Sequence, residues 1–97
     1  MKHPTVILDP FRYEVFSGKK EIYLPPKEFD TLYALAKNDG KILSRAQLSN
    51  AIDSVQYKDC RAVDQYIARI RKKIGNWVIT TVFGGHGYKC RGVKVVE

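Results

Sequence analysis

The chain has few of the side chains that proteins use to bind metals. Its 97 residues include two cysteines and two histidines. Cys60 and Cys90 form no Cys-x-x-Cys pair, and His3 and His86 are far apart, so the spacing of a structural zinc site is missing. We therefore expect neither a metal nor another cofactor. Two alternatives exist for the cysteines: a disulfide or two free thiols. A reducing cytosol favours the free thiols.

Long apolar runs are missing too. No stretch reaches the roughly 20 apolar residues that a membrane-spanning helix needs, and the N-terminus lacks the apolar segment of a signal peptide. These absences favour a cytoplasmic protein, and the length predicts a single domain over residues 1–97.

The residue patterns of catalytic sites are also absent. The sequence has no carboxylate cluster, no His-x-Glu pair and no spacing of a nucleophile and its base. Asp53, Asp59 and Asp64 are close in sequence, but we expect them in a loop, at a helix cap and within a helix. An enzyme such as a nuclease is therefore not expected.

Acidic residues are scarce in the last third of the chain. Residues 61–97 hold eight of the 17 Lys and Arg residues but only two of the 10 Asp and Glu residues. This segment therefore carries +6 of the formal net charge of +7. Such a one-sided distribution suggests a basic face directed at a polyanion, although a solvated lysine-rich surface would have the same composition.

The segment from Arg61 to Lys73 predicts a helix with two different faces. At about 100° per residue, its branched apolar side chains fall on one narrow arc that must enter a core. They are Val63, Ile67, Ile70 and Ile74. The opposite face carries Arg61, Gln65, Ala68, Arg69 and Lys72. These groups are suited to reading guanine and adenine edges or to binding phosphates in a DNA major groove.

The remaining elements predict an α+β fold. Short alternating β-type segments between about residues 5 and 24 predict a small antiparallel sheet, interrupted at Asp9-Pro10. Three helices are expected between about 26 and 75, and a hairpin between about 77 and 91, with strands Trp77–Val82 and His86–Arg91 around a glycine-rich turn. A basic helix followed directly by a hairpin is typical of a winged helix-turn-helix.

The helix ends carry recognisable signals. Proline at Pro25-Pro26 suits the start of the first helix, and Glu28 stands where the carboxylate of a capping box would lie. Ser44 is a suitable N-cap for a second helix over residues 45–52. Asp59 is a suitable cap for the third helix, which we expect to end before Gly75.

Four ordered blocks of residues lie between Tyr23 and Tyr88. They are Leu24-x-Pro26-x-Glu28-Phe29, Gly40-x-Ile42-Leu43-Ser44-Arg45-x-x-Leu48, Arg61-x-Val63-Asp64-x-x-Ile67-x-x-Ile70-Arg71-x-Lys73-Ile74, and Thr81-Val82 with Gly87-Tyr88. In these blocks and in their order, the chain resembles the OmpR/PhoB-type winged-helix effector domains of bacterial response regulators.

The resemblance implies sequence-specific binding of double-stranded DNA in transcription regulation within a two-component phosphorelay. The third helix would enter the major groove, with Gln65 and Arg69 at positions similar to base readers. Other positions match residues that hold phosphates or assist them: Arg61, Tyr66, Arg71, Lys72 and Lys73. The hairpin would form the wing over the minor groove, with Gly85, His86 and Gly87 at its turn.

The resemblance also implies partners. The loop after the second helix corresponds to a segment that can contact RNA polymerase in similar domains, and an ordinary surface connection is the alternative. Its residues are Ser54, Val55, Gln56, Tyr57 and Lys58. A receiver or other regulatory domain would accompany this domain in a full-length protein. Such domains often bind as dimers on tandem half-sites about one helical turn apart.

Two departures from the family pattern concern a helix cap and the wing. Pro25 stands where the family usually has threonine, so the side-chain half of the capping box is lost. The wing lacks the usual arginine and has Phe83 there, in a turn that is one residue longer. The missing arginine supports an alternative function: a winged-helix protein-interaction module whose basic face meets an acidic partner.

Overall fold

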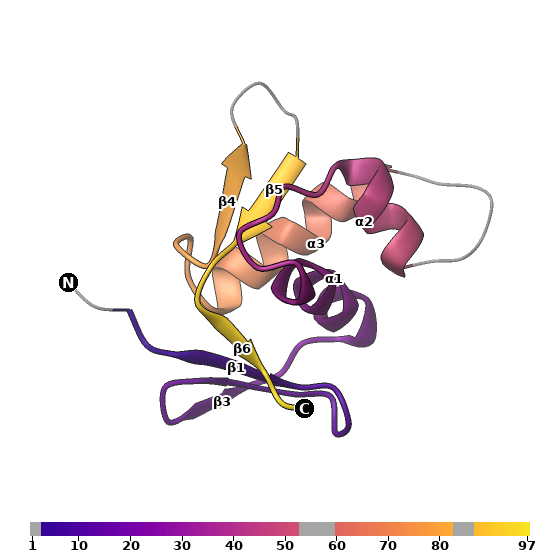
Figure 1. Cartoon of the computed structure of the whole chain (residues 1–97). Coiled ribbons are helices and arrows are strands. Elements are labelled where there is room, and N and C mark those ends of the chain that lie inside the picture. Colours follow the sequence, from indigo (N-terminus) through magenta and orange to yellow (C-terminus); the bar gives the residue numbers. More distant parts are fainter. Residues whose placement is uncertain (1–2, 53–59, 83–86) are drawn as a thin grey trace.

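The computed structural model describes residues 3–52, 60–82 and 87–97 (Figure 1). For Cys60 and Arg61 it describes the backbone only. In chain order the elements are β1 (Val6–Asp9), β2 (Glu14–Ser17), β3 (Lys20–Ile22), α1 (Pro26–Lys37), α2 (Arg45–Ile52), α3 (Cys60–Lys73), β4 (Ile79–Val82), β5 (Gly87–Cys90) and β6 (Val93–Val95). The predicted order of strands, three helices and a hairpin is confirmed. The strand β6 was not predicted.

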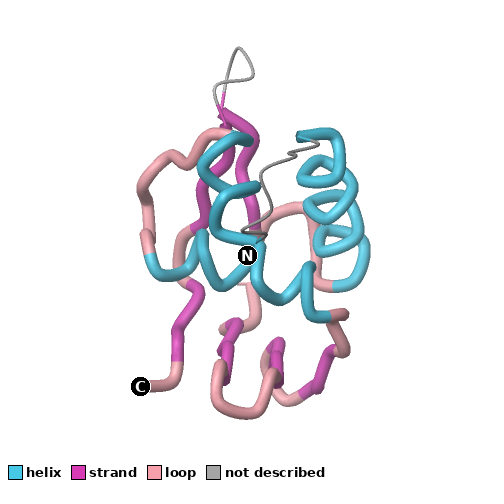
Figure 2. The backbone as a smooth tube through the Cα atoms, turned by 90° about the vertical axis from the view of Figure 1, so that its right-hand side faces the viewer, coloured by secondary structure: helices cyan, strands magenta, loops and turns pink. Residues whose placement is uncertain are grey.

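The first three strands form the predicted antiparallel sheet, and β6 extends it. The strand order is β3-β2-β1-β6, with β6 parallel to β1 and Val6 aligned with Val93. Val6, Leu8 and Val15 point from this sheet into the core and are buried. The last strand therefore brings the end of the chain beside its beginning. Figure 2 shows the helices above this sheet and the hairpin beyond them.

The start of α1 corrects one expectation from the sequence. The N-cap is Pro25, without a side-chain capping bond, as its replacement of threonine predicts. Glu28, however, does not complete a capping box: its carboxylate pairs with Lys73 of α3 instead. In a capping box this carboxylate accepts the backbone N–H of the N-cap residue. Proline has no N–H to donate, so the expected bond could not form.

Helix α2 begins as expected. The Ser44 hydroxyl accepts a hydrogen bond from the backbone N–H of Gln47 at 3.1 Å. The side-chain oxygen of Gln47 in turn accepts one from the backbone N–H of Ser44 at 2.8 Å. This reciprocal pair is a capping box with glutamine as the third residue. The cap predicted for α3, Asp59, lies outside the described residues.

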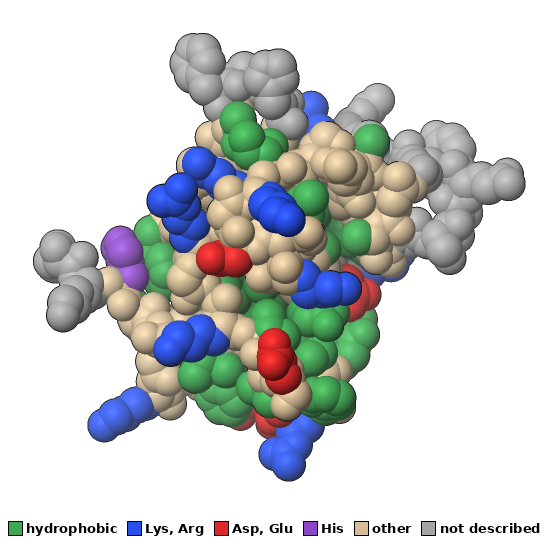
Figure 3. Space-filling model, viewed as in Figure 1, with side chains coloured by type: hydrophobic (Ala, Val, Ile, Leu, Met, Phe, Trp, Pro, Cys, Tyr) green, Lys and Arg blue, Asp and Glu red, His purple; other side chains and the backbone are tan. Residues whose placement is uncertain are grey.

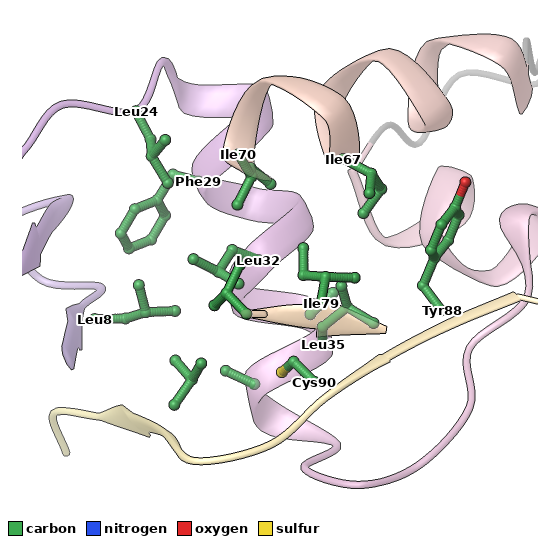
Figure 4. Close-up of a cluster of buried hydrophobic side chains, with 14 of the residues drawn as sticks. Leu8, Leu24, Phe29, Leu32, Leu35, Ile67, Ile70, Ile79, Tyr88 and Cys90 are labelled. Carbon is green, nitrogen blue, oxygen red and sulfur yellow. The ribbon is translucent and has the colours of Figure 1, made fainter. Parts of the chain in front are cut away.

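The core forms where α1 and α3 cross above the sheet. Figure 4 shows side chains of α1 and α3 converging with others from β1, β4 and β5. The predicted inward arc of α3 is confirmed, because Val63, Ile67 and Ile70 are all at most 1% exposed. Ile74, at the helix end, is half-buried against the same cluster. The opposite face of α3 must therefore point away from the core.

The hairpin of β4 and β5 is attached to the connection between α1 and α2. Its strands are antiparallel and pair Ile79 with Cys90 and Val82 with Gly87. Leu43 and Tyr88 exchange two backbone hydrogen bonds of 2.9 Å, one in each direction. The extended piece predicted at Ile42-Leu43 is therefore a bridge to the hairpin. β4 begins at Ile79, later than expected, because the chain turns between Gly75 and Val78, where the Val78 N–H donates to the Gly75 carbonyl oxygen. Trp77, within this turn, stacks on His3.

Gly87 should be required sterically at this bridge. Its φ is +145°, and a Cβ there would lie 2.2 Å from the carbonyl oxygen of Leu43. Gly92 also has a positive φ, +75°, but a Cβ there would meet nothing within 4 Å. We predict that Gly92→Ala costs only the backbone strain of about 1–2 kcal/mol. Gly87→Ala should cost roughly 1–3 kcal/mol more, because the bridge must move. Urea unfolding of both variants measures the difference, and equal losses would contradict it.

Candidate nucleic-acid interface

The exposed face of α3 consists of small or polar side chains. Gln65, Ala68, Arg69 and Lys72 are exposed, and the Arg69 side chain is 58% accessible. The small Ala68 allows close approach of another molecule to the helix backbone. Arg61 lies in the first turn, where only the backbone is described, and Tyr66 is half-buried at the edge of the face. This face matches the one predicted from helical periodicity.

Positive charge is spread more widely than this helix. On the face drawn in Figure 3, Lys and Arg side chains lie over several elements, and carboxylates occupy less of the surface. Charge alone therefore does not single out one interface. The candidate site is distinguished by geometry: a regular helix whose outward groups can form several directed hydrogen bonds, beside a projecting hairpin (Figure 1).

Arg71 connects α3 to the hairpin. Its Nε and Nη2 atoms donate to the carbonyl oxygen of Ile79 at 3.2 and 2.8 Å, and Nη2 also donates to the Thr81 hydroxyl at 2.8 Å. The guanidinium lies 5.8 Å from the ring centre of Tyr88. The sequence suggested a phosphate-binding role for Arg71 and did not indicate this contact. A helix-to-strand hydrogen bond leaves no periodic signal in the sequence.

Lys73 and Arg69 both face the beginning of α1. Lys73 Nζ lies 3.2 Å from Glu28 Oε1, and Arg69 Nη1 lies 3.9 Å from Glu28 Oε2. Lys73 also lies over the Tyr23 ring, 5.9 Å from its centre. The Glu28 side chain is 3% exposed. Two of the predicted DNA-contacting cations therefore share one buried carboxylate.

Asp64 connects three elements on the other side of α3. Its Oδ1 accepts hydrogen bonds from Arg45 Nε of α2 at 3.0 Å and from the Tyr88 hydroxyl of β5. Burial raises the pKa of Tyr88, and the hydrogen bond and charge of Asp64 raise it further. Because Asp64 lies beyond the first turn of α3, these hydrogen bonds rather than the helix dipole account for its position.

Two predicted elements lie largely outside the described residues. Of the predicted wing residues, Gly87 is buried at the Leu43 bridge, whereas Gly85 and His86 are not described. The predicted polymerase loop also lies entirely outside the described residues. Its residues are Ser54, Val55, Gln56, Tyr57 and Lys58.

The described parts of the chain give little basis for a metal site or a reactive thiol. Over residues 3–52, 60–82 and 87–97, no three His, Cys, Asp or Glu side chains are grouped so that they could hold a metal ion. Cys90 is a buried free thiol. Burial raises its pKa to about 12, with a smaller contribution from Asp39, so it stays protonated at neutral pH.

Among the described helices, none has the length and apolarity required to cross a membrane.

This arrangement of elements defines a winged-helix domain. The family model described as "Transcriptional regulatory protein, C terminal" matches residues 19–90. The chain belongs to this family. This agrees with the resemblance of its sequence to the OmpR/PhoB-type effector domains.

Several relatives and solved structures are similar to the chain over most of its length. The response regulator PmrA of Pseudomonas aeruginosa is 33% identical over 87 residues, 88% of this chain and 39% of the relative. The sensory transduction protein RegX3 of Mycolicibacterium smegmatis is 36% identical over 92 residues, 90% and 40% of the two chains. The chain thus spans about two-fifths of the length of these relatives.

Among solved structures, the RstA DNA-binding domain of Klebsiella pneumoniae in complex with the RstA box has a TM-score of 0.80 and 30% identity, covering 95% of this chain and 96% of that one. The CpxR DNA-binding domain of E. coli has a TM-score of 0.79 and 27% identity, covering 95% of both chains. The likeness to RstA extends over almost the entire domain.

Arg71 should contribute to stability, whereas its neighbour Lys72 should not. Arg71→Ala removes hydrogen bonds between a charged group and β4, and we expect a loss of about 1–3 kcal/mol. Lys72→Ala removes the same formal charge from an exposed position and should change stability by less than about 0.5 kcal/mol. Chemical unfolding of the two variants tests this contrast. A Lys72→Ala loss as large as that of Arg71→Ala would show that charge, not the contact, matters.

Proposed function

We propose that the chain is the sequence-specific, double-stranded DNA-binding effector domain of a bacterial transcriptional regulator of the response-regulator type. The observation that carries this proposal is the exposed face of α3. It presents Gln65, Arg69 and Lys72 from a rigid helix beside the hairpin. Support comes from the RstA domain, which has the same fold and whose solved structure contains its DNA box.

In this proposal α3 lies in the major groove. The amide of Gln65 would pair with adenine and the guanidinium of Arg69 with guanine, the pairings that their donor and acceptor geometry favours. Contacts to phosphates would fix the register without reading sequence. We assign these contacts to Arg61, Tyr66, Arg71, Lys72 and Lys73. Lys72 is the most direct candidate, since Arg71 and Lys73 already bind groups of the protein.

The hairpin would lie over the adjacent minor groove as the wing, to which we also assign Gly85, His86 and Gly87. Because the usual wing arginine is missing at Phe83, we expect the wing to contribute less than α3 to binding. Gly87 would act indirectly, by allowing the close bridge to Leu43 that holds the hairpin.

The proposal includes partners beyond DNA. The segment 54–58 would contact RNA polymerase, and a receiver or other regulatory domain would control the effector domain in a longer protein. Two copies would bind as a dimer on tandem half-sites. The protein would act in the cytoplasm, without catalysis and without a cofactor.

Selection from a random duplex library tests the function itself. The purified domain should enrich a motif, and two copies spaced about 10 base pairs apart would indicate tandem binding. The selection should be repeated at low and at physiological salt, because phosphate contacts make affinity fall steeply with salt. Binding to an acidic protein, with no duplex enriched at either salt, would favour the protein-interaction alternative.

Substitutions of Arg69 and of Lys72 should change DNA binding in different ways. Arg69→Ala should lower discrimination at one base pair by about 1–3 kcal/mol, since it removes a base contact. Lys72→Ala should weaken binding to all duplexes alike and reduce the salt slope by about 1, since it removes a phosphate contact. Binding to the selected site and to single-base variants over a salt series gives both quantities. Unchanged base preference in Arg69→Ala would show that the recognition surface is misplaced.

A further inference from the structure

We infer that Glu28 is a positioning residue for Arg69 and thereby sets the sequence specificity of the domain. This inference rests on the proposed function. Glu28 lies at the beginning of α1, on a different element from the residues expected to touch DNA. Its buried carboxylate nevertheless reaches the cation that we assign to base reading.

Glu28 is available for this role because of the residue before the helix. In a capping box, the carboxylate at this position would accept the N–H of the N-cap residue. The N-cap here is Pro25, which has no N–H. The carboxylate therefore turns to α3, and its place in the first turn of α1 lowers the cost of burying its charge, because a helix N-terminus favours an anion.

The two carboxylate oxygens have different partners. Oε1 forms a hydrogen bond of 3.2 Å with Lys73, whose side chain is 36% exposed and also lies over Tyr23. Oε2 lies 3.9 Å from Nη1 of Arg69, whose side chain is 58% exposed. Lys73 is thus the closer and less exposed partner, and it neutralises the buried charge. Arg69 Nη1 lies within ion-pair distance of the carboxylate but beyond hydrogen-bond distance, and most of the Arg69 side chain remains accessible from outside.

This arrangement favours a particular orientation of the guanidinium. Arginine side chains have many rotamers, and ordering one on binding costs affinity. A carboxylate that attracts Nη1 restricts those rotamers before DNA arrives and turns the rest of the fork away from α1. The bidentate pairing with guanine needs such alignment, whereas a phosphate contact tolerates many orientations. Loss of Glu28 should therefore affect base discrimination more than general affinity.

The test compares Glu28→Gln with Asp30→Asn. Both variants remove one carboxylate from α1 and raise the net charge by one, but Asp30 bonds to Tyr13 of the β1–β2 turn rather than to α3. Binding is measured to the selected duplex and to its variant at the base pair that Arg69 reads. We expect Glu28→Gln to lower that discrimination about three- to tenfold, and Asp30→Asn to leave it unchanged.

A second pair of variants separates positioning from a loss of folding. In an Arg69→Ala background, Glu28→Gln should have no further effect on discrimination, because the side chain that it orients is gone. Discrimination at base pairs that Arg69 does not read should be retained in Glu28→Gln, which a general loss of structure would not allow. Thermal unfolding of each variant confirms that the folded protein is compared.

The outcomes are distinguishable. If Glu28→Gln strengthens binding to all duplexes and keeps base discrimination, Glu28 would only mask positive charge. That result would overturn the inference. It is also overturned if Glu28→Gln lowers discrimination equally with and without Arg69. Failure of the proposed function has a different signature: the unmodified domain would then select no motif at all.

Discussion

The packing of α3 on α1 is the constraint on which the rest of the structure depends. Ile67 and Ile70 enter the core beside Leu32 and Leu35 of α1 (Figure 4), and Val63 belongs to the same buried cluster. Apolar burial of this kind is the main favourable term in folding. Because these side chains cannot leave the core, the rotation of α3 about its axis is determined. The outward direction of Gln65, Ala68, Arg69 and Lys72 follows directly.

Polar contacts then hold α3 at its edges. Asp64 joins it to α2 and β5, Arg71 joins it to β4, and Lys73 joins it to α1. Each contact is directional, so together they position the helix relative to the hairpin more precisely than apolar packing alone. A helix held in this way fixes the positions from which its outer side chains extend. Such preorganisation is what directed contacts to base edges require.

The sequence predicted the elements whose signals are local. The inward arc of α3, the Ser44 cap and the extended Ile42-Leu43 piece depend on residues within a few positions of each other, and all are confirmed. The strand β6 was missed, because three residues at the chain end become a strand only by pairing with β1. Glu28 was assigned to a local cap, although its partner lies 45 residues away.

The same distinction applies to the candidate site. Periodicity identified the exposed residues of α3, since the core side of a helix defines its opposite face. It did not show that Arg71 binds the hairpin or that Lys73 and Arg69 share a buried carboxylate. Those contacts arise from tertiary packing and change what each cation can do. Arg69 and Lys72 are both exposed cations of α3, but Arg69 lies 3.9 Å from the Glu28 carboxylate, the contact from which its proposed orientation is inferred.

The most direct test of this account is an NMR titration of the isotope-labelled domain with a selected duplex. If α3 is the recognition element, the largest amide shift changes will lie on its exposed face, around Gln65, Ala68, Arg69 and Lys72, with smaller changes in the hairpin. The amides of the four-stranded sheet will change little. The largest changes on that sheet, with α3 unaffected, would contradict the account.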